Sequence, residues 1–104
     1  MGKAKITVLK CNFDEELAKE YACEGLGKCH IHTEGQVYFA DWTKPEGLCD
    51  DAWIGIQQYV FALSHGGGNF YDGHWLNRPD IAICCCNDGL RPVVFKVEQV
   101  EEES

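Results

Sequence analysis

The sequence is poor in basic residues, has no long apolar run and contains no C-x-x-C motif. Nine lysines and arginines face seventeen aspartates and glutamates, and the formal net charge is −8. Because nucleic-acid affinity depends on lysine and arginine contacts to phosphates, we expect no nucleic-acid partner. No apolar stretch approaches the roughly 18 residues of a membrane-spanning helix, so we expect no insertion into a membrane. The missing C-x-x-C motif excludes the usual zinc-ribbon and thioredoxin patterns.

A signal-peptide pattern is also missing, because residues 1–5 lead directly into an alternating apolar segment without a hydrophobic h-region. We therefore predict a cytoplasmic protein. The seven cysteines are an odd number, and a reducing compartment keeps cysteines as thiols. Clustered thiols in such a compartment indicate metal binding or redox chemistry more often than disulfide bonds.

A chain of 104 residues is long enough for one hydrophobic core. We predict a single α+β domain over residues 1–100 and a disordered acidic tail over residues 101–104. The hydrophobic pattern predicts the order β-α-β-α-β-β, with a mainly antiparallel sheet and both helices packed on one face. The expected strands are residues 4–10, 36–42, 80–86 and 91–100, the last two joined by a tight turn.

Two helices are expected between these strands. Asn12 is predicted to cap the first, over residues 14–22, with Glu15 as its capping-box partner. Asp50 or Asp51 is predicted to cap the second and stronger helix, which ends at three consecutive glycines. The buried face of the second helix is predicted from apolar residues at spacings of three and four: Trp53, Ile56, Val60 and Leu63.

Cysteines lie beside three predicted turns. Cys29 is in a glycine-rich loop, Cys49 comes just before the second helix, and Cys84, Cys85 and Cys86 enter the hairpin turn. A helix N-terminus favours the thiolate form at Cys49, although the neighbouring carboxylates oppose it. Strand alternation places Cys85 on the opposite face from Cys84 and Cys86, so these three cannot face one site. We therefore favour Cys29, Cys49 and Cys86 as ligands, with Cys84 or Cys85 as a fourth.

The other cysteines and the loop histidines are less informative. Cys11 and Cys23 flank the first helix without a nearby ligand pattern, and free cysteine often packs as a small hydrophobe. His30, next to Cys29, is a candidate nitrogen ligand for zinc. A solvated loop histidine is the simpler interpretation.

Three stretches of the chain resemble one family: KPEGLCDDAW at 44–53, GGNF at 67–70 and CCNDGLRPVVFKVE at 85–98. The chain resembles a family of small, uncharacterised bacterial and archaeal proteins of about this length, with Pro-Glu-Gly-x-Cys and Cys-x-Asp-Gly-x-Arg-Pro-Val motifs. The resemblance implies a role for Cys29, Cys49 and Cys86, and also for Asp88 and Arg91. It implies no particular activity.

The leading hypothesis is a small metalloprotein in which Cys29, Cys49 and Cys86 hold an iron–sulfur cluster, with 4Fe–4S favoured, because soft thiolates suit such a cluster. It would serve electron transfer with a redox partner protein or bind a small ligand, including a sulfur-bearing one.

A structural zinc module using the same cysteines, with or without His30, is the second hypothesis. Metal-free redox or persulfide-transfer chemistry at Cys49 is the third. A binding site at the glycine turn, residues 66–69, is least favoured, because carbonyls point outward at a helix C-terminus.

Overall fold

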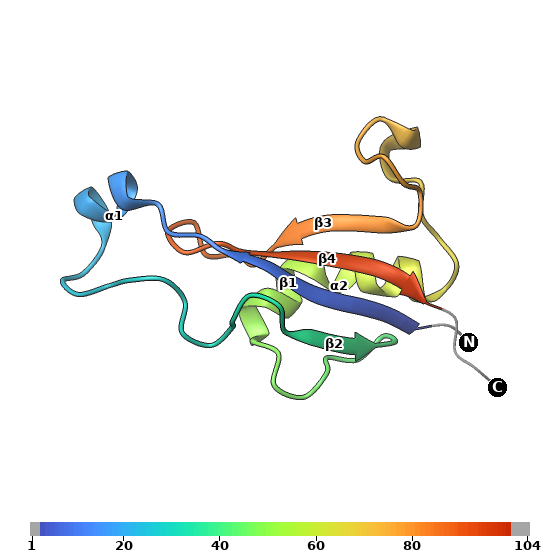
Figure 1. Ribbon diagram of the computed structural model, residues 1–104, viewed down its shortest axis with the longest axis horizontal. Coiled ribbons are helices and arrows are strands. Elements are labelled where there is room, and N and C mark those ends of the chain that lie inside the picture. Colours follow the sequence, from blue (N-terminus) through green and yellow to red (C-terminus); the bar gives the residue numbers. More distant parts are fainter. Residues whose placement is uncertain (1–2, 101–104) are drawn as a thin grey trace.

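The computed structural model describes residues 3–100, and the predicted acidic tail, residues 101–104, lies outside the described residues. It confirms the α+β class and the order β-α-β-α-β-β (Figure 1). The elements are β1 (Lys3–Cys11), α1 (Glu15–Tyr21), β2 (Val37–Ala40), α2 (Asp50–Ser64), a short 3₁₀ helix η1 (Phe70–Gly73), β3 (Ile81–Cys85) and β4 (Val93–Val100).

The four strands form one antiparallel sheet in the order β2-β1-β4-β3. β1 and β4 are the central pair, with Ile6 opposite Val97. The predicted hairpin is confirmed, since β3 and β4 are paired along their length and Cys85 lies opposite Val94. Because neighbouring strands are antiparallel, the end of β1, the end of β3 and the start of β4 meet at one end of the sheet.

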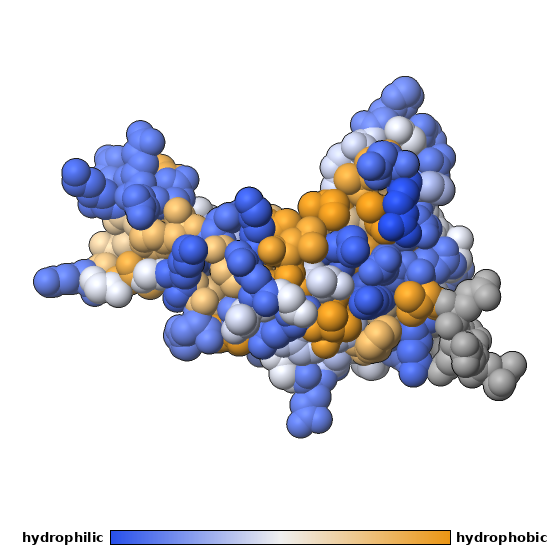
Figure 2. Space-filling view, viewed as in Figure 1, coloured by the Kyte–Doolittle hydropathy of each residue, from blue (hydrophilic) through white to orange (hydrophobic). Residues whose placement is uncertain are grey.

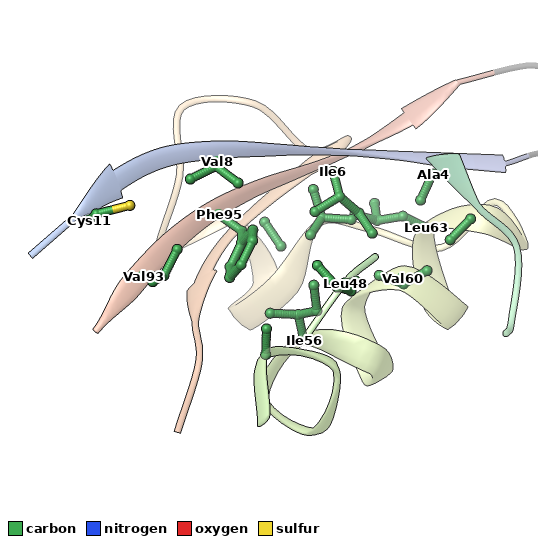
Figure 3. Packing of buried hydrophobic residues seen from close by; sticks show 14 residues of the cluster. Ala4, Ile6, Val8, Cys11, Leu48, Ile56, Val60, Leu63, Val93 and Phe95 are labelled. Atoms are coloured by element: carbon green, nitrogen blue, oxygen red, sulfur yellow. The ribbon is translucent and has the colours of Figure 1, made fainter. Parts of the chain in front are cut away.

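The helix α2 covers one face of this sheet and contacts β1, β3 and β4. Its predicted apolar positions Ile56, Val60 and Leu63 are fully buried, and Trp53 is half-buried. Phe95 on β4 lies between the sheet and the helix (Figure 3), and burying a side chain of this kind contributes about 2–3 kcal/mol. The same cluster contains Ala4, Ile6, Val8, Cys11, Ala40, Leu48, Ala52, Ala82, Val93 and Val97.

The cap of α1 differs from the prediction. The N-cap is Asp14, whose Oδ1 accepts a hydrogen bond from the N–H of Leu17 at 3.0 Å, so the predicted cap at Asn12 is wrong. The reason is that the chain still follows the hairpin turn at this point. The N–H of Asn12 donates to the carbonyl of Pro92, and the N–H of Asp14 donates to the carbonyl of Leu90. The helix begins only after these contacts end.

The packing of α1 also differs. Leu17 and Tyr21, whose spacing predicts the helix, are 43% and 71% exposed, and Ala18 is the buried residue of α1. Figure 1 shows α1 beyond the end of the sheet rather than on its face. The expected packing on one face therefore applies to α2 alone.

The predicted start of α2 is wrong, whereas its predicted end is confirmed. The N-cap is Cys49, and Asp50 and Asp51 lie inside the first turn, so the predicted aspartate cap is wrong. The glycine stop is confirmed: Gly66 has φ 85°, and its N–H donates to the carbonyl of Leu63 at 3.2 Å.

The sheet face away from α2 is open. Figure 2 shows hydrophobic and hydrophilic residues interspersed over it. Val37 and Phe39 on β2 are exposed, while Lys5 and Glu98 on the central strands are half-buried. Within residues 3–100, no helix has the length and apolar character needed to cross a bilayer.

Candidate metal centre

Three cysteines from separate segments line one pocket at the end of the sheet where β1, β3 and β4 meet. Cys29 comes from the connection between α1 and β2, Cys49 is the N-cap of α2, and Cys86 directly follows β3. The cavity volume is about 60 Å³, enough for a few water molecules. The other walls are formed by Ile31, His32, Asp51, Ala52, Asp88, Arg91 and Val93. The structure therefore brings together the three cysteines that the sequence favoured.

The backbone of Cys49 is held on both sides. Its N–H donates to Nε2 of His32 at 3.3 Å, and its carbonyl accepts from the N–H of Trp53 at 3.0 Å. As the N-cap of a 15-residue helix, Cys49 also lies where unpaired N–H groups and the helix dipole favour negative charge. Asp50 and Asp51 place two carboxylates at the same helix end. The position of Cys49 therefore depends on both α2 and the loop that carries His32.

Cys86 is fixed by β4. Its N–H donates to the carbonyl of Val93 at 3.1 Å, and the N–H of Val93 donates to Sγ of Cys86 at 3.3 Å. The Cys86 thiol also makes a weak contact, at 3.9 Å, with the carbonyl oxygen of Arg91. A backbone N–H directed at a sulfur stabilises negative charge on that sulfur. Cys86 is therefore held in place and polarised by its partner strand.

Arg91 supplies positive charge to the pocket. Its Nε donates to Oδ2 of Asp88 at 2.7 Å, and this bond raises the pKa of Arg91. Arg91 lines the same cavity as Cys29 and Cys86. In turn, Arg91 lowers the pKa of Asp88, which also accepts the N–H groups of Leu90 and Arg91. The Asp88–Arg91 pair is thus an ordered, charged part of the wall.

Cys11 belongs to the core, which confirms its interpretation as a small packed hydrophobe, but its place next to the pocket was not predicted. It is buried at the end of β1 and lies opposite Val93 of β4, at the same end of the core (Figure 3). Its thiol donates to the carbonyl of His32 at 3.3 Å. Burial raises the pKa of Cys11, and the carboxylate of Glu34 adds to this rise. Cys11 is therefore close to the pocket, although it does not line it.

His32 is buried, whereas a solvated loop histidine was the expectation. It is only 4% exposed although it lies in an irregular segment. Its ring meets those of Tyr38 and Phe95 edge-on, with centroid separations of 5.9 and 5.6 Å. These partners lie on β2 and β4, so no local pattern marks His32 as buried. His30, the predicted candidate for zinc, is exposed and does not line the pocket.

The two candidates for a fourth ligand, Cys84 and Cys85, lie outside the pocket. Cys84 packs against the hydrophobic core, and burial raises the pKa of its thiol to about 12, with a further contribution from Cys85. Cys85 is exposed on the opposite side of β3, and neither residue lines the pocket. Cys23, after α1, is exposed, so the interpretation as a packed hydrophobe is wrong for this cysteine. Because successive side chains of a strand point to opposite faces, Cys85 points away from the side of β3 on which Cys84 lies.

The donor atoms of the pocket have the chemistry of a thiophilic metal centre, but their positions are not those of ligands around one ion. Three thiols around one cavity are the soft donors that iron–sulfur clusters and zinc prefer. In residues 3–100, however, no three His, Cys, Asp or Glu side chains are arranged to hold a single metal ion. The donor chemistry fits a thiophilic centre, and binding requires the thiols to turn toward a shared point.

No protein-family model, curated protein or solved structure matches the chain. The resemblance drawn from the Pro-Glu-Gly-x-Cys and Cys-x-Asp-Gly-x-Arg-Pro-Val motifs therefore stays a prediction.

Proposed function

We propose that the protein is a small cysteine-ligated metalloprotein whose pocket holds an iron–sulfur cluster through Cys29, Cys49 and Cys86. The observation that carries this proposal is that three thiols from three separate segments line one small cavity. All three are half-buried beside the core. What distinguishes them from Cys84, which is also half-buried beside the core, is that they line the cavity.

The surroundings of the sulfurs support the proposal, because metal binding needs deprotonated thiols. The N-terminus of α2 favours negative charge at Cys49, and the N–H of Val93 favours it at Cys86. Arg91 lines the same cavity as Cys29 and Cys86. Cys49 and Cys86 thus each have a dipole beside them, and the cavity wall also carries one cationic side chain.

The charged side chains of the pocket also favour a cationic ligand. Asp51 and Asp88 contribute carboxylates to the wall, and Arg91 is already paired with Asp88. Once the thiols are deprotonated, the pocket carries an excess of negative charge. A positively charged iron centre balances that charge, whereas an anion alone would add to it.

When bound by the three cysteines, an iron–sulfur cluster, with 4Fe–4S favoured, would supply either binding of a small ligand, including a sulfur-bearing one, or electron transfer to a redox partner protein. The chain's own contribution is to orient the sulfurs and to place Arg91 in the wall of the same cavity. Ile31 and Val93 add apolar side chains to that wall. A cytoplasmic location, which keeps these thiols reduced, belongs to the proposal.

Iron and acid-labile sulfide should be measured in anaerobically purified protein together with its absorption spectrum. We expect both elements and a coloured protein. A colourless, iron-free protein contradicts the proposal.

One equivalent of zinc, with unfolding by a chelator, would instead support the zinc module. A metal-free protein with one thiol of lowered pKa would support redox or persulfide-transfer chemistry.

A further inference from the structure

His32 connects three parts of the molecule at the edge of the pocket. Its ring nitrogens contact the N-cap of α2 and Gln36, directly before β2, and its carbonyl oxygen accepts a hydrogen bond from the thiol of Cys11 on β1. The side chain is 4% exposed, and its ring also forms part of the pocket wall. A buried polar ring with all its polar atoms paired is costly to replace and fixes the groups bonded to it.

The hydrogen-bond network defines the proton position on this ring. The N–H of Cys49 can only donate, so Nε2 of His32, at 3.3 Å, must be unprotonated to accept it. A neutral ring then carries its proton on Nδ1. That nitrogen lies 3.2 Å from Oε1 of Gln36, which accepts, and 3.3 Å from the hydroxyl of Tyr38. The chain of bonds runs from Cys49 through His32 to Gln36.

Gln36 is itself anchored. Its Oε1 also accepts from the N–H of Thr33 at 3.0 Å and from the hydroxyl of Tyr38 at 3.3 Å. Gln36 comes directly before β2, and its N–H donates to the carbonyl of Thr33. The network therefore links the position of Cys49 to the sheet.

We propose that His32 is a positioning residue for Cys49: as the Nδ1–H tautomer bonded to Gln36, it holds the N-cap of α2 so that the Cys49 thiol faces the pocket, and it is not itself a ligand. Both ring nitrogens are engaged within the protein, which leaves neither free for a metal. Residues of this kind orient ligands, and their loss commonly lowers metal affinity about 10–100-fold. This inference rests on the proposed function for the role of Cys49 as a ligand.

The first test needs no metal. In metal-free protein labelled with ¹⁵N, the ring nitrogens of His32 should show the neutral Nδ1–H tautomer. The amide resonance of Cys49 should move in His32→Leu but remain close to its original position in His32→Gln, because the glutamine oxygen reaches far enough to accept the same N–H. A proton on Nε2 of the wild-type ring, or a Cys49 amide unmoved in His32→Leu, overturns the proposal.

The second test uses cobalt(II), whose thiolate bonds produce charge-transfer absorption. We expect His32→Leu to bind cobalt about 10–100-fold more weakly than wild type, with the affinity largely restored in His32→Gln. Equal loss in both variants would indicate that the ring only fills space, and equal affinity in all three proteins would also overturn the inference. Wild-type protein that binds neither cobalt nor iron counts against the proposed function alone, because the tautomer and the Cys49 amide are measured without metal.

Discussion

The N–H of Val93 donates a hydrogen bond to the sulfur of Cys86 at 3.3 Å, while the N–H of Cys86 donates to the carbonyl of Val93 at 3.1 Å. The first of these bonds joins the backbone of β4 directly to a proposed ligand. The second continues the pairing of the hairpin past the end of β3. One pair of residues thus belongs to both the fold and the site.

Because serine offers an oxygen that can accept the same N–H, Cys86→Ser should preserve the fold. We expect a change in the free energy of unfolding below about 1 kcal/mol, since a hydrogen bond of this kind has a net value near that size. Urea denaturation of the metal-free variant measures it. A much larger loss would show that the thiol at position 86 is required for folding and not only for ligation.

Gly55 lies where α2 crosses the end of β3. A Cβ at this position would be 2.3 Å from the carbonyl oxygen of Cys85. Glycine to alanine inside a helix normally stabilises by roughly 0.5–1 kcal/mol, but overpacking of this kind costs about 1–3 kcal/mol. We therefore expect Gly55→Ala to lower the free energy of unfolding in urea denaturation.

The matched control is Gly27→Ala, where a Cβ meets nothing within 4 Å. Its stability should stay within about 0.5 kcal/mol of wild type. Similar values for the two variants would mean that α2 does not approach β3 as closely as described.

Cys84 should make the protein sensitive to alkali. Burial raises its pKa in the fold from 9.0 to about 12. Below pH 9 the thiol is neutral in both states, whereas between pH 9 and 12 it ionises only in the unfolded chain, so stability declines as pH rises. We expect Cys84→Ala to reduce the slope of this decline in denaturation series from pH 8 to 11. An unchanged slope in Cys84→Ala, or an equal reduction in the exposed control Cys85→Ala, would contradict the assignment.

Asp88 should have the opposite pH dependence. The bond from Arg91 and two backbone N–H groups lowers its pKa below the usual 3.8. Its stabilising contribution is therefore present above pH 3.8 and is lost as pH falls through the lower folded value. We expect Asp88→Asn to be less stable than wild type at pH 7 by about 1–2 kcal/mol. The two proteins should converge in acid.

The control for this substitution is Asp50→Asn, which removes an exposed ion pair with Lys44. Its stability at pH 7 should differ from wild type by less than about 0.5 kcal/mol. A difference between Asp88→Asn and wild type that stays constant from pH 7 to pH 2 would rule out the carboxylate as the cause.

The elements that the sequence predicts correctly are those governed by neighbouring residues. The face of α2 follows from the spacing of Ile56, Val60 and Leu63, and its end follows from Gly66, which adopts the positive φ that glycine tolerates. The hairpin of β3 and β4 follows from two β-prone runs around a turn. The cap of α1 was missed because Asp14 competes with Asn12, and the contacts with the hairpin turn decide between them.

The lining of the pocket was predictable only in part for the same reason. Cys29, Cys49 and Cys86, which line it, could be selected because each lies beside a turn. Cys11 and His32 could not, because their positions depend on the pairing of β1 with β4 and on the packing of the loop against β2. Strand order is a long-range property, and the period-two pattern of a strand does not specify its neighbour.

The central claim, that Cys29, Cys49 and Cys86 form one metal centre, is tested most directly by iron and sulfide content in single serine variants prepared anaerobically. We expect Cys29→Ser, Cys49→Ser and Cys86→Ser each to lose most of the iron and sulfide. The exposed controls Cys23→Ser and Cys85→Ser should retain wild-type content. Full retention in the three pocket variants, or an equal loss in Cys85→Ser, would contradict the claim.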